Sequence, residues 1–166
     1  NYDSQGCVVV RNDEIREILP YIRLNLTPIL IFPENPGLTA EYRNPGTNGK
    51  LRTFFDTWLK AWEQKRIDDY IKHYHSEFTS KGLTREQWKA YKAGLNTVYE
   101  SIEVGMERPR FYTHPKYAVI TFVQNYRSRL KSGGWGHVSR GTKTLFVAEE
   151  RGEPKIVAED YSELSW

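Results

Sequence analysis

A run of large apolar side chains at helical spacing constrains the fold of this chain more than any other feature. The spacing is three and four residues, and the run consists of Leu51, Phe54, Phe55, Trp58, Leu59 and Trp62. Charged residues occupy the positions between them, so the pattern predicts an amphipathic helix with one broad aromatic face. Such a face must be buried against a wide apolar surface, and the alternating runs after residue 100 are the only wide surface that the sequence offers. The pattern therefore predicts a core helix lying on a sheet.

Length and charge limit the class of protein. The 166 residues suffice for one ordinary domain, or for one domain plus a fragment of another. The 24 basic and 21 acidic residues give a net charge of +3, and no basic block is longer than two residues, so we expect no nucleic-acid partner. No apolar run reaches the length of a membrane span. The single cysteine excludes an internal disulfide framework.

Residues 1–33 are predicted to form a strand, a helix and a strand. Cys7–Val10 is a short β-branched run, and Thr27–Phe32 is a second strand-like run that ends at Pro33. Between them, Asn12 or Asp13 is expected to cap a helix beginning near Glu14, with an apolar stripe of Ile15, Ile18, Leu19 and Ile22. Three such small elements cannot bury their apolar faces alone, so we interpret them as the end of a larger domain whose upstream part lies outside this sequence.

A Pro- and Gly-rich segment, residues 34–50, is predicted to be a linker to a second domain at 51–166. After the aromatic helix the periodicity slips near Lys65–Asp68, which predicts a break and then a short helix at Asp68–His75. Thr84 and Gln87 have the spacing of a capping box for a third helix, Arg85–Val98. This third helix is expected to bury Trp88, Tyr91 and Leu95.

Four strand-like runs separated by turn signals follow. They are Glu100–Tyr112, Tyr117–Leu130, Lys143–Glu150 and Ile156–Leu164, with hairpin loops expected at 132–137 and 151–154. The second run alternates, which places Ile120, Phe122, Gln124 and Tyr126 on one face. Helices followed by a meander of long strands predict an α+β fold, with about three helices packed on one face of a curved antiparallel sheet.

Residues 1–33 are called the leader below, and Cys7 is the sharpest candidate for chemistry in it. Gly6 before it permits the tight turn that a cysteine nucleophile needs if backbone N–H groups are to receive an oxyanion. A lone cysteine at the head of a β-branched run is also what an inert core residue looks like. The residues alone leave both interpretations open, because no partner base can be identified for the thiol.

The order Ser4-x-Gly6-Cys7, a β-branched strand, Asn12, an Ile/Leu-striped helix and TPILI resembles the end of a YkuD-type L,D-transpeptidase catalytic domain. The resemblance implies that Cys7 attacks a stem-peptide carbonyl of peptidoglycan, that Gly6 and Cys7 supply oxyanion N–H groups, and that Ser4 shapes the site. This chain has Gln5 where many members have His, and Val9 where Arg is usual.

The family's histidine base lies on an upstream strand outside this sequence. The resemblance therefore implies a parent protein that is a cysteine L,D-transpeptidase or L,D-carboxypeptidase of the bacterial periplasm or cell envelope. Its partner would be a peptidoglycan stem peptide or glycan. The fragment itself would hold the nucleophile without its base.

Residues 51–166 resemble the nuclear-transport-factor-2-like (SnoaL-like) fold, a cone of helices against a strongly bent sheet. The likeness depends on the Trp58-x3-Trp62 pair, the following Asp69-Tyr70 and the strand meander. The fold implies a pocket in the cone, with candidate residues Trp88, Tyr91, Arg110, Tyr126, Trp135 and Lys143. The alternative is that these aromatic residues only fill the core.

Three functions remain open for residues 51–166, which are called the cone below. The first is an accessory domain of a cell-wall enzyme, and the second is a non-catalytic module for binding or for homodimerisation through the sheet. The third is a free-standing SnoaL-like isomerase or hydrolase. The last would need a carboxylate or histidine deep in the pocket. His73 and His75 share no helical face, being two residues apart, so we expect no metal site. We expect no cofactor.

Overall fold

A computed structural model describes residues 10–23, 27, 29, 49–113 and 117–164. Contacts divide the chain into two compact units, Asn1–Ile31 and Phe32–Trp166, which are described separately. None of the helices in the described part of the chain has the length and apolar character needed to cross a membrane.

The described part of the first unit is one helix with a tight final turn. α1 (Asn12–Ile18) begins after Arg11 and continues as the 3₁₀ helix η1 (Leu19–Tyr21). The predicted caps were wrong, because Asn12 and Asp13 lie inside the helix and the Arg11 guanidinium pairs with the Asp13 carboxylate. Ser4, Gly6, Cys7 and nearly all of both predicted strands lie outside the described residues.

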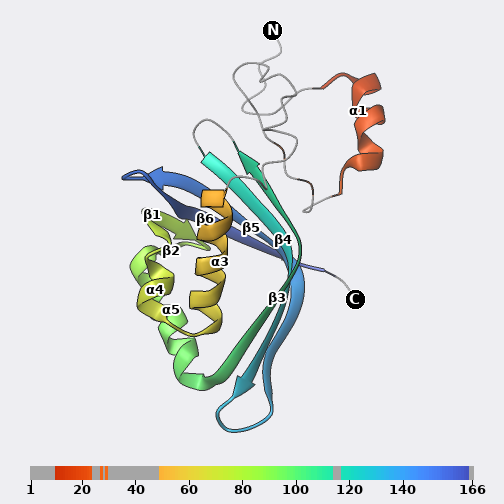
Figure 1. Ribbon diagram of the computed structural model, residues 1–166. Coiled ribbons are helices and arrows are strands. Elements are labelled where there is room, and N and C mark those ends of the chain that lie inside the picture. Colours follow the sequence, from red (N-terminus) through yellow and green to blue (C-terminus); the bar gives the residue numbers. More distant parts are fainter. Residues whose placement is uncertain (1–9, 24–26, 28, 30–48, 114–116, 165–166) are drawn as a thin grey trace. The chain divides into compact units, whose positions relative to one another are not determined.

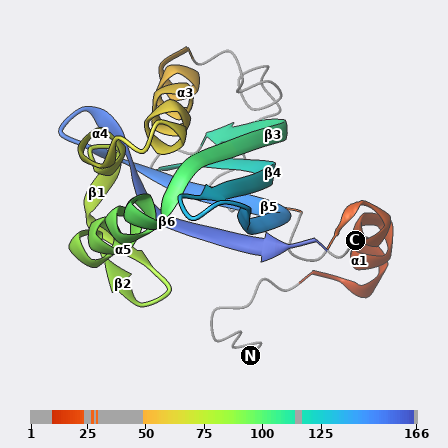
Figure 2. The ribbon, with the colours of Figure 1, turned by 90° about the horizontal axis from the view of Figure 1, so that it is seen from below.

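The second unit is α+β, with its helices gathered on the concave face of one bent sheet (Figures 1 and 2). The helices are α3 (Gly49–Glu63), α4 (Ile67–Ile71) and α5 (Arg85–Val98). The strands are β1 (Tyr74–Ser80), β2 (Leu83–Thr84), β3 (Tyr99–Thr113), β4 (Tyr117–Leu130), β5 (Trp135–Glu150) and β6 (Glu153–Glu163). Their order across the sheet is β2-β1-β6-β5-β4-β3.

The sheet is mixed, which corrects the predicted all-antiparallel arrangement. The meander from β3 to β6 is antiparallel as predicted, but β1 runs parallel to β6, with Tyr74 opposite Ile156. The short helix predicted to reach His75 ends at Ile71, because the backbone beyond it pairs with the sheet. The Ile156 N–H donates to the His73 carbonyl oxygen at 2.8 Å.

β5 is eight residues longer at its start than predicted. The β4–β5 turn occupies residues 131–134, where Gly133 and Gly134 take φ angles of 91° and 83°. Because two glycines suffice for this reversal, Trp135, Gly136 and His137 belong to the strand and not to the predicted loop.

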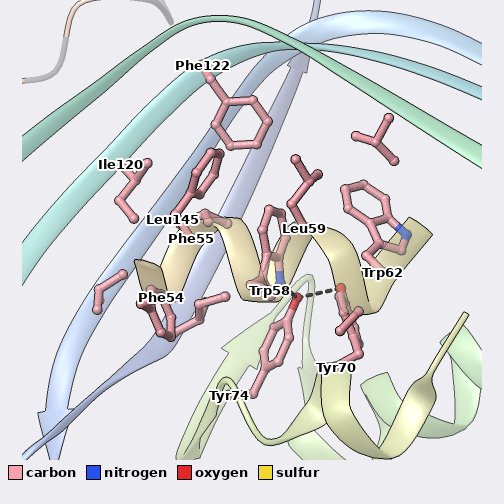
Figure 3. Packing of buried hydrophobic residues seen from close by; sticks show 14 of the residues in the cluster. Phe54, Phe55, Trp58, Leu59, Trp62, Tyr70, Tyr74, Ile120, Phe122 and Leu145 are labelled. Atoms are coloured by element: carbon pink, nitrogen blue, oxygen red, sulfur yellow. Dashed lines mark hydrogen bonds between the residues drawn. The ribbon is translucent and has the colours of Figure 1, made fainter. Parts of the chain in front are cut away.

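The aromatic face of α3 forms the core, as its spacing predicts (Figure 3). Phe55 and Trp58 are fully buried, and the Phe55 ring meets the edges or faces of Phe111 and Phe122 at centroid distances of 5.7 and 5.1 Å. Full burial of one such side chain contributes about 1.5–3 kcal/mol. α3 ends where Lys65 takes a φ of 58°, at the predicted break.

The third helix has the predicted bounds and the predicted capping box. The Thr84 N–H donates to Gln87 Oε1 at 2.9 Å, and the Gln87 N–H donates back to Thr84 Oγ1 at 3.4 Å. Trp88 is buried as predicted, but Tyr91 is 50% exposed. Tyr91 instead lies at the rim, with its ring 5.5 Å from that of Trp88.

Gly141 on β5 gives a test of the close packing between β5 and β6. A Cβ atom there would lie 2.5 Å from both the Ser162 carbonyl oxygen and the Tyr161 ring. Because one neighbour is backbone, Gly141→Ala should lower the free energy of unfolding by about 1–3 kcal/mol in urea denaturation.

Gly94→Ala is the matched control, because nothing lies within 4 Å of its Cβ position on α5. This variant should be more stable than the parent by about 0.5–1 kcal/mol, since alanine favours a helix interior. Equal effects at the two glycines would contradict the described packing.

Candidate ligand pocket in the cone

A cavity of about 340 Å³ lies between α5 and the concave face of β4, β5 and β6. Its aromatic lining comprises Trp62, Trp88, Tyr91, Tyr99, Tyr126 and Tyr161. Its polar lining comprises Ser80, Lys81, Lys92, Gln124, His137, Ser139, Lys143, Glu159 and Asp160. The volume and the mix of aromatic walls with a few polar groups are typical of small-molecule sites.

The structure brings together four of the six residues predicted for the pocket. Trp88, Tyr91, Tyr126 and Lys143 line the cavity. Arg110 is exposed on β3 and does not line it. Trp135 is also absent from the lining, being 57% exposed with the Arg127 guanidinium 5.3 Å from its ring.

Lys143 is paired within the cavity wall instead of standing free at its mouth. Its ammonium forms an ion pair with the Glu159 carboxylate, and the two residues are only 6% and 7% exposed. Burial raises the pKa of Glu159, but the ammonium groups of Lys143 and Lys92 and the hydrogen bonds from Lys143 and Tyr74 outweigh it. The pKa of Glu159 therefore lies below its ordinary value, and the carboxylate is ionised at neutral pH.

A chain of hydroxyl groups connects Glu159 to the aromatic core. The Tyr74 hydroxyl donates to Glu159 Oε2 at 2.8 Å. It is also hydrogen-bonded to the Tyr70 hydroxyl and accepts from Trp58 Nε1 at 3.1 Å (Figure 3). Burial, and next the negative charge of Glu159, raise the pKa of both tyrosines well above the ordinary value. Both phenols therefore remain protonated and satisfy the carboxylate as part of the fold.

Lys92 is a second lysine of the lining, and it does not form an ion pair with Glu159. Its ammonium lies 4.7 Å from the ring centroids of Trp62 and Trp88 and 5.9 Å from that of Tyr70. Within the described part of the chain it has no hydrogen bond or ion pair. Burial lowers its pKa to about 8, opposed by the charge of Glu159. The rings attract the ammonium, and its positive charge in the cavity favours an anionic ligand.

Sequence reasoning missed Lys92 and Glu159 for different reasons. Lys92 follows Trp88 by four residues on α5, so its position on the buried face was readable from helical spacing. Glu159 was not readable, because the pairing of β6 with β5 shifts register between Phe146 and Val147. That irregularity changes which side chains of β6 point inward.

No cluster of three or more histidine, cysteine, aspartate and glutamate side chains able to hold a metal occurs among the residues that the structure describes. Charge in the pocket is instead supplied by lysine. Three lysines face two carboxylates in the lining, Lys81, Lys92 and Lys143 against Glu159 and Asp160. The excess is positive, which favours an anionic ligand.

The bent sheet with helices on its concave face and a pocket between them is the arrangement of NTF2-like domains. A family model described as the Cds6 C-terminal NTF2-like domain matches residues 50–160. The chain therefore belongs to this family. A search of curated protein sequences found no match.

Solved structures agree with this assignment. The chain is 31% identical to Bd1075 from Bdellovibrio bacteriovorus, with a TM-score of 0.75, over 98% of this chain and 56% of that one. A likeness over 98% of the chain includes most of the first unit as well as the cone. The chain thus spans little more than half the length of that protein.

More distant likenesses show the fold alone. A putative scytalone dehydratase from Novosphingobium aromaticivorans is 11% identical, with a TM-score of 0.65 over 74% of this chain and 87% of that one. A putative calcium/calmodulin-dependent protein kinase II association domain from Xanthomonas campestris is 16% identical, with a TM-score of 0.58 over 69% and 85%. The family model covers the cone and gives no support to a YkuD-type assignment for residues 1–33.

The Lys143–Glu159 pair should be strongly coupled. Lys143→Met or Glu159→Gln alone leaves a buried group without its partner and should lower the free energy of unfolding by about 3–5 kcal/mol. The double variant should lose less than the sum of the two, by about 0.5–3 kcal/mol. Urea denaturation of the four proteins measures this coupling.

The matched control is the exposed pair Arg127–Glu103, 2.6 Å apart, whose removal should change stability by about 0–1 kcal/mol. Because the pKa of Glu159 is lowered by folding, its stabilisation is present above the ordinary value of 4.5 and is lost as pH falls through the folded-state pKa. Additive single variants, or a coupling that survives full protonation, would contradict the described pair.

Lys92→Met should stabilise the protein at pH 7. The folded-state pKa of about 8 lies below the ordinary 10.5, so charging this lysine opposes folding fully below pH 8. The penalty falls as pH rises from about 8 towards 10.5, and the advantage of the variant should shrink in the same window. Thermal unfolding across this pH range measures it, with Lys60→Met on the exposed face of α3 as the control. A constant difference would show that Lys92 is solvated like a surface lysine.

Proposed function

We propose that the cone is a non-catalytic binding module that takes a small anionic ligand in the cavity between α5 and the sheet. The observation that carries this proposal is the Lys92 ammonium, which lies against aromatic rings in the cavity and makes no direct ion pair with any described residue. Such a cation is costly to the fold, and a ligand that brings a negative charge would offset the cost. The excess of lysines in the lining supports the same ligand class.

The state of Glu159 argues for binding over catalysis. A SnoaL-like isomerase or hydrolase would need a carboxylate or histidine that lies deep in the pocket and is free to accept a proton. Of the three such residues in the lining, His137 and Asp160 are exposed, and Glu159 is the buried one. Glu159 has one oxygen paired with Lys143 and the other accepting from Tyr74, and its pKa is lowered. A general base at neutral pH instead needs a raised pKa and a free lone pair.

For the parent protein, we also propose that the leader is the end of a catalytic domain that acts on the cell wall. It depends on the Ser4-x-Gly6-Cys7 resemblance to the end of YkuD-type L,D-transpeptidase domains. The likeness to Bd1075 along nearly the whole chain supports the leader and the cone as parts of one longer protein. In this proposal Cys7 of the parent forms the acyl-enzyme in the periplasm or cell envelope, and the cone binds a stem peptide or glycan.

A homodimer through the sheet is the second candidate. Val138 and Phe146 on β5 are 49% and 39% exposed, which is high for apolar residues in a central strand. Sedimentation equilibrium of the unliganded protein distinguishes this role from ligand binding, because association would then depend on protein concentration and not on ligand.

Titration with soluble muropeptides that carry free carboxylates tests the binding proposal. The wild type should bind, and Lys92→Met should weaken binding at least about tenfold, since a hydrogen bond to a charged group contributes about 1.5–3 kcal/mol. Tyr126→Phe tests the cavity wall, and Lys60→Met should bind like the wild type. Calorimetry or NMR shift mapping provides the measurement. Absence of binding at millimolar ligand, or equal binding by Lys92→Met, would contradict an anion site at Lys92.

A further inference from the structure

We propose that Lys92 is a nucleophile that forms a reversible imine with a small 2-oxo acid, a carbonyl compound with a carboxylate on the neighbouring carbon. This inference goes beyond the proposed function and rests on it only for the anionic part of the ligand. Its starting point is the Lys92 nitrogen, which lies 4.7 Å from the ring centroids of Trp62 and Trp88 in a cavity of about 340 Å³. Lysine amines that act as nucleophiles in proteins are activated by apolar surroundings of this kind.

The Lys92 nitrogen can be reached from the cavity. The side chain is half-buried, and it has no hydrogen bond or ion pair with any described residue. Its nitrogen is not among the described polar atoms that are fully buried without a partner, so it keeps accessible surface in the cavity that it lines. Lys81, Tyr91 and Asp160 in the same lining are exposed, which opens the cavity to solvent and to a ligand.

The surroundings of Lys92 favour the neutral amine that a nucleophile requires. Burial lowers its pKa to about 8; the negative charge of Glu159 opposes this shift, and the positive charges of Lys143 and Lys81 add to it. About a fifth of the Lys92 amines are then neutral at pH 7.4, against about one in a thousand for a lysine of ordinary pKa. Lys143 is not expected to react in the same way, because its ammonium is held in the ion pair with Glu159.

The step needs no oxidant or reductant. The Lys92 lone pair forms a bond to the carbonyl carbon, and the π pair of the C=O bond moves to the oxygen, which takes up a proton. The hydroxyl of this carbinolamine then leaves as water, carrying the proton that the ammonium gave up to become a nucleophile. Overall, one ammonium and one carbonyl give one protonated imine and one water, so the positive charge stays on the nitrogen.

The retained charge selects the rest of the ligand. In a 2-oxo acid the carboxylate is bonded to the carbonyl carbon, so after the reaction it lies directly beside the positive imine nitrogen. The excess of lysines over carboxylates in the lining favours the same negative group. A neutral aldehyde would form the same bond without either gain.

Reductive trapping on the full chain at pH 7.4 tests the proposal. The protein is incubated with glyoxylate and cyanoborohydride, which reduces the imine to a stable secondary amine, and peptide mass spectrometry follows the modified fraction of each lysine. Lys92 should be modified at least about tenfold faster than Lys60, which is exposed on α3, because far more of its amine is neutral. Lys143, which is buried but ion-paired, should react more slowly than both.

Glyoxylamide is the matched probe, because it keeps the shape and the aldehyde and has an amide in place of the carboxylate. The ratio of the Lys92 rate to the Lys60 rate should be at least about threefold smaller with glyoxylamide than with glyoxylate. Equal rates at Lys92 and Lys60 with both probes would overturn the imine proposal and leave the anion pocket to its own titration. A Lys92 that reacts fast with both probes alike would retain the nucleophile but contradict the anionic ligand, and with it the proposed function.

Discussion

The buried Glu159 carboxylate is the interaction on which the cone depends. Its oxygens meet Lys143 of β5 and Tyr74 of β1, and its backbone carbonyl accepts from Ser80 Oγ at 2.8 Å. One residue of β6 thereby connects the strands on both of its sides and, through Tyr70, the helix α4. Because its charge is neutralised inside the wall, Glu159 can line the cavity without leaving a buried carboxylate unpaired.

Lys143 and Lys92 divide structural and binding roles in the pocket. Lys143 neutralises Glu159 and belongs to the fold, whereas Lys92 faces aromatic rings and forms no ion pair with any residue that the structure describes. Stability alone would favour an apolar side chain at position 92. A residue that weakens the fold while shaping a cavity is characteristic of a binding site, where stability and function are in opposition.

Local patterns in the sequence predicted the elements whose side chains follow a regular period. The stripe of α3, the capping box of α5 and the alternation of β4 are all local, and each predicted element is present. β1 was missed because its character comes from parallel pairing with a strand about 80 residues later, which no local pattern encodes. The pocket was predicted in part: Trp88 and Lys143 were found, but Glu159 faces inward only because β6 has a register shift.

The parallel pairing of β1 with β6 also has a consequence for the order of assembly. β6 is the last strand of the unit, yet it lies between β1 and β5 in the sheet. During synthesis the ribosome releases β1 long before its neighbour β6 exists, so the inner edge of β1 must wait for its partner. Closure is therefore a late, non-local event. A nascent cone that stalls before β6 exposes apolar surface of the kind that attracts chaperones, and it lacks the Glu159 carboxylate that neutralises Lys143.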